Sequence, residues 1–310
     1  MKRSTADTPA DYIQPLNMNR LRGRVLHLPA KKPGAPEILF VYGHHSSLER
    51  WWGVVKFLNR YAAITMPDLP GFGGMDSFYK IGKEGSIDNL ADYLASFIKL
   101  RYKRRQVIVV GMSLGFVVAT RMLQRSPEMA KNISKLVSFA GFAHWEDFTF
   151  SRTKRLTYYW ISKLLTFRGP AWLFRYVALH PRLIRMAYKN TGNGKFNGVM
   201  QEEFDELIKF EVTLWHGNEV RTWAKTTTEF LRLNNCHKHV DMPVYHVGIK
   251  DDHYFDNNHV EQHMQVIFSE YHLVDLLDLD KHAPSVIADE KSAAAYVPPK
   301  LRRMLMREAK

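Results

Sequence analysis

The chain has 310 residues, of which 45% are hydrophobic and 24% are charged, a composition typical of a soluble folded protein with a large core. No stretch approaches the roughly 18 uninterrupted apolar residues that a transmembrane helix requires, and residues 1–20 lack the apolar centre of a secretory signal. The single cysteine, Cys236, excludes an internal disulfide and a Cys-x-x-Cys metal site. We therefore expect a cytoplasmic protein that is not integral to a membrane.

The net charge of +13 is unevenly distributed along the chain. Residues 142–200 carry ten Lys or Arg against Glu146 and Asp147, and residues 296–310 carry five against Glu308. Basic surface attracts phosphates, anionic lipid head groups or acidic substrates, although a solubilising surface is the commoner explanation. No recognisable nucleic-acid-binding module accompanies the charge, so we expect no nucleic-acid partner.

From Glu37 onwards, short β-type runs alternate with helical patterns, which is typical of an α/β protein with a parallel sheet. The predicted strands are residues 37–42, 62–66, 106–110, 135–140, 243–247 and 272–276. The predicted helices between them are residues 48–59, 87–98 and 114–124. We assign residues 1–20 to a flexible lead-in, and residues 21–141 together with 242–296 to the α/β core.

Residues 142–241 interrupt this alternation and show helical patterns rich in aromatic and basic residues. The predicted helices within them are residues 148–167, 172–179 and 202–216. We predict a helical cap inserted into the core. Residues 297–310 form a basic tail that we expect to be ordered only by a partner.

Residues 111–115 read Gly-Met-Ser-Leu-Gly and lie between a predicted buried strand and a predicted helix. This strand–turn–helix context is typical of a nucleophile elbow, in which the glycines permit a tight turn and the strained serine faces the substrate. We therefore predict Ser113 as a nucleophile.

A serine nucleophile needs a base, and the base needs an acidic partner; with this kind of elbow they follow in the order serine, acid, histidine. His282 lies after the last predicted strand and is the predicted base. Asp251 follows the strand at 243–247 and is the first choice for the acid. Asp252 is an adjacent alternative, and Asp256 is a third.

Acyl transfer also requires donors for the oxyanion. We predict the backbone N–H groups of Leu114, directly after the nucleophile, and of His44, in the loop after the strand at 37–42. His44 and His45 are adjacent but lack spaced carboxylates, so we expect no metal there.

These motifs together resemble the α/β-hydrolase superfamily of capped esterases and carbon–carbon bond hydrolases. The resemblance rests on the runs 42–47, 68–73, 111–115, 248–251 and 282–284, and it covers about residues 22–141 and 242–296. It implies an eight-stranded, mostly parallel sheet, a helical lid, a triad of Ser113, Asp251 and His282, and no cofactor. The sequence departs from the family pattern at Tyr42-Gly43, where His-Gly is usual. A serine in the elbow, where haloalkane dehalogenases and epoxide hydrolases carry aspartate, argues against those reactions.

The expected function is hydrolysis of a carboxylic ester through an acyl-enzyme, as in an esterase or lipase. A carbon–carbon bond hydrolase of vinylogous diketones would use the same triad, and a non-catalytic basic interaction protein on this scaffold is a further alternative. The cap aromatics either pack on the core beneath solvated charges, or line an apolar acyl pocket while residues 142–200 contact an anionic membrane.

Overall fold

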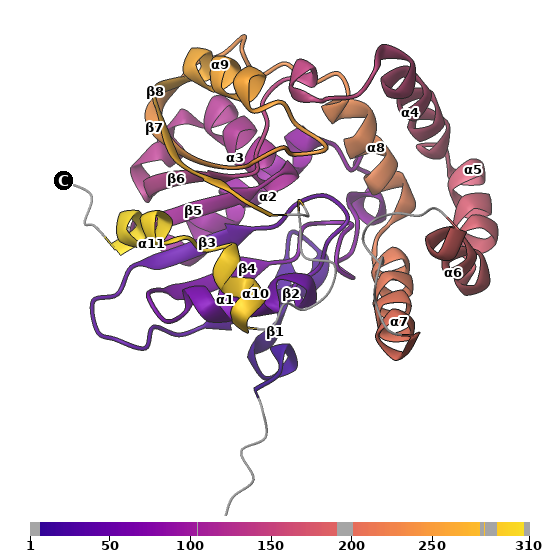
Figure 1. Cartoon of the computed structure of the whole chain (residues 1–310), viewed down its shortest axis with the longest axis horizontal. Coiled ribbons are helices and arrows are strands. Elements are labelled where there is room, and N and C mark those ends of the chain that lie inside the picture. The colour runs from indigo at the N-terminus through magenta and orange to yellow at the C-terminus, as the bar shows by residue number, and fades with distance from the viewer. Residues whose placement is uncertain (1–6, 104, 191–200, 280–281, 283–289, 307–310) are drawn as a thin grey trace, which may run out of the picture.

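The computed structural model describes residues 7–103, 105–190, 201–279, 282 and 290–306. One eight-stranded sheet forms its centre, with the strand order β1-β2-β4-β3-β5-β6-β7-β8 (Figure 1). In chain order the strands are β1 (Ile13–Met18), β2 (Leu21–Leu28), β3 (Glu37–Val41), β4 (Ala63–Pro67), β5 (Val107–Met112), β6 (Ile133–Phe139), β7 (Val240–Ile249) and β8 (Phe268–Leu277). Among these described strands, the β1–β2 and β2–β4 pairs are antiparallel and the other pairs are parallel, which confirms the predicted fold class.

Helices cover the sheet because the βαβ crossovers between parallel strands pass over its faces. The helices of the core are α1 (Trp52–Leu58), α2 (Ile87–Tyr102), α3 (Leu114–Arg125), α9 (Asn257–Ile267), α10 (Glu290–Ala295) and α11 (Pro299–Met306). Ser86 caps α2 by accepting a hydrogen bond from the Asn89 N–H at 3.2 Å. The short 3-10 helices are η1 (Pro9–Tyr12), η2 (Glu49–Trp51), η3 (Phe78–Ile81), η4 (Pro127–Asn132) and η5 (Trp145–Asp147).

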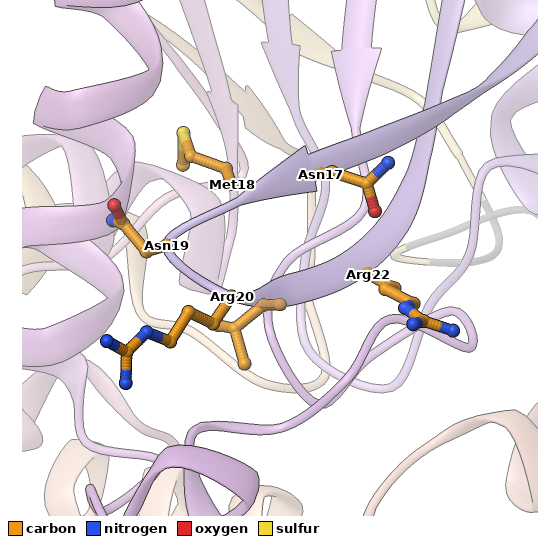
Figure 2. Close-up of a pocket in the computed structure, with 6 residues that line it drawn as sticks. Asn17, Met18, Asn19, Arg20 and Arg22 are labelled. Atoms are coloured by element: carbon orange, nitrogen blue, oxygen red, sulfur yellow. The ribbon is translucent and has the colours of Figure 1, made fainter.

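The prediction of a flexible lead-in over residues 1–20 is wrong for residues 9–18, which form η1 and β1. β1 pairs with β2 as a hairpin whose turn residues, Asn19 and Arg20, both have positive φ, at 52° and 64°. Such a turn matches the twist of the two strands but normally carries glycine. Because this turn has no glycine, the sequence did not indicate a hairpin. Figure 2 shows this hairpin tip, with the Arg20 and Arg22 side chains pointing away from each other.

The basic tail is also more ordered than predicted. Residues 299–306 form α11, which buries Leu301 (3% exposed) and Leu305 (2% exposed) in the main hydrophobic core. Leu301 and Leu305 are spaced i and i+4, so they lie on one face of the helix. This apolar face packs on the core of the same chain, and the helix needs no partner to cover it. Residues 307–310 of the predicted tail lie outside the described part of the chain.

The segment between β6 and β7 is helical, as predicted, and holds no strand in its described residues. After η5 it consists of α4 (Arg152–Leu165), α5 (Arg168–Leu173), the π-helix η6 (Phe174–Ala178), α6 (Pro181–Asn190), α7 (Gln201–Gly217) and α8 (Val220–Phe230). Figure 1 shows α4 to α8 gathered on one side of the sheet. They share a small apolar cluster that is separate from the main core and includes Leu165, Leu179 and Ala224. None of the helices in the described residues is both long and apolar enough to cross a bilayer.

Candidate active site

Four loops meet at one edge of the sheet. They follow β3, β5, β7 and β8, which run parallel to one another, so their carboxyl ends face the same way. In open α/β sheets this edge is where ligands bind. The loops carry the predicted residues His44, Ser113, Asp251 and His282.

Ser113 occupies a strained turn between β5 and α3, with φ 49° and ψ −116°. The glycines on either side are packed so closely that neither position has room for a side chain. A Cβ on Gly111 would lie 2.5 Å from Phe116 Cα, and one on Gly115 would lie 2.1 Å from the Val41 carbonyl oxygen. The two glycines therefore fix this serine in its unusual backbone conformation.

The loop after β3 packs directly on this turn. A Cβ on Gly43 would lie 3.2 Å from Ser113 Cβ and 2.8 Å from Met112 Sδ. Within the described part of the chain, neither the His44 N–H nor the Leu114 N–H donates a hydrogen bond to the backbone or to a side chain. Leu114 is the first residue of α3, where a helix leaves its N–H groups unpaired.

The acidic partner of His282 is Asp252. His282 Nδ1 lies 2.7 Å from Asp252 Oδ2, and the Tyr254 N–H donates to Asp252 Oδ1 at 2.8 Å. The Asp252 side chain is only 3% exposed. This geometry departs from the first choice, Asp251, which is exposed and has a left-handed φ of 53° that turns the chain. The third candidate, Asp256, instead caps α9 by accepting hydrogen bonds from two N–H groups.

Ser113 and His282 border the same cavity. Its volume is about 40 Å³, and its lining residues are Gly43, His44, Ser46, Arg50, Trp51, Met112, Ser113 and His282. A second hollow of about 380 Å³ lies at the hairpin tip of Figure 2, lined by residues 17–22. It is formed by a turn and offers no nucleophile or histidine, so the smaller cavity is the candidate site.

Aromatic rings connect the histidines on the two sides of this cavity. The ring of Phe230, from α8, lies 5.1 Å from His44 and 5.9 Å from Phe142. Phe142 stacks on Phe255 at 4.7 Å, and Phe255 lies 5.3 Å from the His282 ring. A chain of apolar rings therefore links the His44 and His282 side chains.

The His44 side chain is held by the inserted helix α8. Its Nε2–H donates to the Trp223 carbonyl at 3.2 Å and lies 3.1 Å from Thr226 Oγ1. Burial, together with the nearby imidazole of His45, lowers the pKa of His44 to about 3. This imidazole is therefore neutral at pH 7, and the predicted oxyanion donor at this residue is its backbone N–H.

Arg50 is a residue of the cavity that the sequence did not single out. Its guanidinium forms an ion pair with Glu211 of α7, and the two residues are 6% and 1% exposed. The buried Arg50 Nε has no hydrogen-bond partner among the described residues. The sequence showed only that a charged residue, Arg50, lies within the predicted helix 48–59. Its partner, Glu211, lies 161 positions later, so the ion pair could not be predicted.

The inserted helices are also anchored to the loop after β4. At the α7–α8 junction, Asn218 Oδ1 accepts a hydrogen bond from the Gly73 N–H at 3.0 Å. The Glu219 N–H donates to the Gly71 carbonyl at 2.8 Å. These two hydrogen bonds join the inserted segment to the loop after β4.

The unusual Tyr42 has a structural explanation. Its hydroxyl donates to Asp68 Oδ1 at 2.9 Å and accepts from the Leu69 N–H at 3.0 Å. The side chain is fully buried. Tyr42 therefore ties the loop after β3 to the loop after β4 and leaves the backbone of Gly43 and His44 free to face the cavity.

One cluster in the described residues has the donor atoms for a metal ion, namely His144, Glu146 and His263. Glu146 Oε2 lies 3.4 Å from His144 Nδ1 and 3.8 Å from His263 Nε2. His144 Nδ1 already accepts a hydrogen bond from the Glu146 N–H, and His263 Nδ1 pairs with buried Asp147 at 2.5 Å. Ion pairs and a helix cap account for this arrangement, and it does not border the cavity.

Comparisons with known proteins agree with this architecture. A family model described as the alpha/beta hydrolase fold matches residues 36–276. No curated protein matches the sequence. The chain is similar in structure to epoxide hydrolase CorEH, at 14% identity and a TM-score of 0.61, with 95% of each chain covered. It is also similar to the N-acyl homoserine lactonase AidH, at 15% identity and a TM-score of 0.57, with 88% of this chain and 90% of that chain covered. A membrane phospholipase A, described as a bacterial virulence factor, matches at 12% identity and a TM-score of 0.62, with 94% of this chain and 86% of that chain covered.

Proposed function

Because this chain belongs to the alpha/beta hydrolase fold family, we propose that it is a serine hydrolase that cleaves carboxylic esters through an acyl-enzyme. The observation that carries the proposal is the 2.7 Å contact between His282 Nδ1 and Asp252 Oδ2, on a histidine that shares its cavity with Ser113. A serine, a histidine and a buried carboxylate in this relation are the parts of an acyl-transfer site.

In this mechanism, Ser113 Oγ attacks the ester carbonyl while His282 Nε2 takes its proton. Asp252 accepts the His282 Nδ1–H, which orients the ring and stabilises the imidazolium. Collapse of the tetrahedral intermediate releases the alcohol, which receives the proton from His282 and leaves an acyl group on Ser113. Water then attacks the acyl-enzyme with His282 again acting as the base; the bond from the acyl carbon to Ser113 Oγ breaks, the carboxylic acid leaves, and His282 returns the proton to Ser113 Oγ.

The backbone N–H groups of His44 and Leu114 are the proposed oxyanion donors. Their lack of a hydrogen-bond partner in the described residues and the close packing of Gly43 on Ser113 support this role. Backbone donors held by a packed turn need no reorganisation as negative charge develops on the carbonyl oxygen.

The proposed substrate is an ester with a short apolar acyl group. A cavity of about 40 Å³ has room for about three water molecules, and the rings of Phe230 and Phe255 contact the His44 and His282 side chains that border it. Of the similar structures, the lactonase and the phospholipase are named for hydrolysis of ester bonds. CorEH is named for epoxides, but the elbow serine of this chain favours acyl chemistry.

A fluorophosphonate probe tests the nucleophile, since it reacts covalently with an activated serine. We expect the probe to label the wild-type protein and Ser126→Ala, a variant outside the cavity, and not to label Ser113→Ala. Undiminished labelling of Ser113→Ala would exclude the assignment.

A panel of p-nitrophenyl esters and vinylogous diketones tests the reaction class. Faster turnover of acetyl and butyryl esters than of palmitoyl esters supports the proposed substrate. Turnover of the diketones alone would identify a carbon–carbon bond hydrolase, and no turnover by a protein that resists labelling would identify a non-catalytic scaffold.

We also propose a cytoplasmic location, because a single unpaired cysteine suits a reducing compartment.

A further inference from the structure

The exposed large apolar side chains are concentrated on the inserted helices. Eighteen such side chains are exposed in the described part of the chain, and twelve of them lie between Leu156 and Met186. Soluble proteins expose single apolar residues everywhere, but a concentration on one set of elements marks an interaction surface.

Helix α4 has two different faces. Ser162 and Leu165 are buried, and Tyr159 accepts a hydrogen bond from Arg232, so this face meets the rest of the protein. On the opposite side, Leu156, Trp160 and Leu164 follow one another at i, i+4 and i+8, and they are 43%, 66% and 57% exposed. This spacing forms an apolar row along the outer side of the helix.

The row continues onto the next two helical segments. Phe167, Trp172 and Tyr176 are 59%, 60% and 61% exposed, and the rings of Trp172 and Tyr176 lie 5.2 Å apart. In Figure 1, α4, α5 and α6 follow one another along the side of the molecule that faces away from the sheet. We call the six residues Leu156, Trp160, Leu164, Phe167, Trp172 and Tyr176 the outer face.

The chain segment that carries the outer face has charge of one sign. The sequence from Phe148 to Met200 contains ten Lys or Arg and no Asp or Glu. Arg152, Lys163, Arg168 and Arg182 are exposed on the helices that carry the outer face or adjoin it. Trp, Tyr and Leu beside Lys and Arg are the composition of helices that lie in the interface of an anionic bilayer.

We propose that the outer face binds the surface of a phospholipid bilayer that contains anionic lipids. The aromatic and aliphatic side chains enter the interfacial region, and the surrounding guanidinium and ammonium groups contact lipid phosphates. A second copy of this chain would bring the same positive charge against the outer face, so charge complementarity favours the membrane over self-association. This binding does not depend on the proposed hydrolase reaction.

Not every basic residue of the region belongs to this surface. Arg155 is half-buried, donates to the Leu231 carbonyl at 3.3 Å, and lies 3.9 Å from the centre of the Trp145 ring. Arg185 forms an ion pair with Asp205. Arg155 stabilises the packing of α4 and is unsuitable for testing membrane binding, whereas Lys163 and Arg168 are suitable.

Co-sedimentation of the full chain with phosphatidylcholine vesicles that contain phosphatidylglycerol tests the proposal. We expect wild type and Ser113→Ala to bind equally, with tryptophan emission shifted to shorter wavelength, and binding to weaken at high salt. The double variant Trp160→Ser, Leu164→Ser should bind about tenfold more weakly, as should Lys163→Glu, Arg168→Glu. Circular dichroism verifies that these variants remain folded.

Two matched controls change the same chemistry elsewhere. Leu100→Ser removes a side chain that is 64% exposed on α2, and Lys31→Glu, Lys32→Glu reverses two exposed charges near β2. We expect both controls to bind vesicles like wild type. The proposal is overturned if wild type ignores these vesicles, if the controls lose as much binding as the test variants, or if Trp160→Ser, Leu164→Ser only converts an oligomer to a monomer in sedimentation velocity. If the wild-type protein binds vesicles but hydrolyses no ester, only the proposed function is contradicted.

Discussion

His282 and Asp252 are joined by a 2.7 Å hydrogen bond between Nδ1 and Oδ2, whereas Asp251, one position earlier, is exposed and has a positive φ. Two adjacent carboxylates therefore have different environments at the same edge of the sheet. Since only one of them touches the imidazole, the two make a matched pair of variants.

Asp252→Asn should lower kcat for ester hydrolysis by about 10³ to 10⁴-fold, because an amide does not stabilise the imidazolium or hold the required tautomer. Asp251→Asn should change kcat by less than about twofold, since it removes an exposed charge. Steady-state kinetics on a short p-nitrophenyl ester measures both. An equal loss in Asp251→Asn would return the role to that residue.

Gly115→Ala should destabilise the protein by about 2–3 kcal/mol, because a packed region absorbs an added methyl group only by moving its backbone. The new Cβ would lie 2.1 Å from the Val41 carbonyl oxygen. Gly169→Ala, where nothing lies within 4 Å of the new Cβ, is the control and should not destabilise α5. Urea unfolding of both variants gives the comparison, and similar midpoints would show that the elbow tolerates a side chain.

Glu211→Ala should lower the free energy of unfolding by about 3–5 kcal/mol, because it leaves the buried Arg50 guanidinium without its carboxylate. The double variant Arg50→Met, Glu211→Leu removes both charges and should recover much of this loss. A double-mutant cycle in urea measures the coupling between the two side chains. Additive single effects would mean that the pair does not join α7 to the core.

The contribution of His246 to protein stability should fall as the pH drops from about 6.5 to about 4. Burial lowers the pKa of His246 to about 4, against 6.5 for a free imidazole, so the unfolded chain binds a proton in this range that the folded chain does not. The contribution of His246 to this loss is about 2 kcal/mol between pH 6.5 and 4.5. His44, whose pKa is also lowered by burial, to about 3, acts in the same direction.

The variant His246→Asn isolates this contribution, because asparagine still offers a hydrogen bond to Ser138 but does not titrate. Its free energy of unfolding should decline less steeply with falling pH than that of wild type. Urea titrations at pH 6.5 and 4.5 give the change in the free energy of unfolding between these pH values. An equal change in both proteins would show that His246 takes up a proton in the folded state.

The sequence alone predicted the features that depend on short-range pattern. The elbow at 111–115 needs only two glycines, a strand before it and a helix after it, and the structure has all of these. The long helical insertion and the parallel part of the sheet followed from periodicity, because a buried strand and an amphipathic helix differ in their repeat. His282 was selected by its position after the last strand, and the structure places it on the same cavity as Ser113.

Tertiary structure decided the contacts between distant parts of the chain. Asp251 and Asp252 have the same side chain, and only the backbone turn after β7 determines which one reaches His282. The pairing of Arg50 with Glu211 joins positions 161 residues apart, and β1 and α11 take their place because the core leaves surfaces for Met18 and Leu301 to cover. Pattern fixes which face of an element is apolar, but loop conformation and packing choose the partner of each side chain.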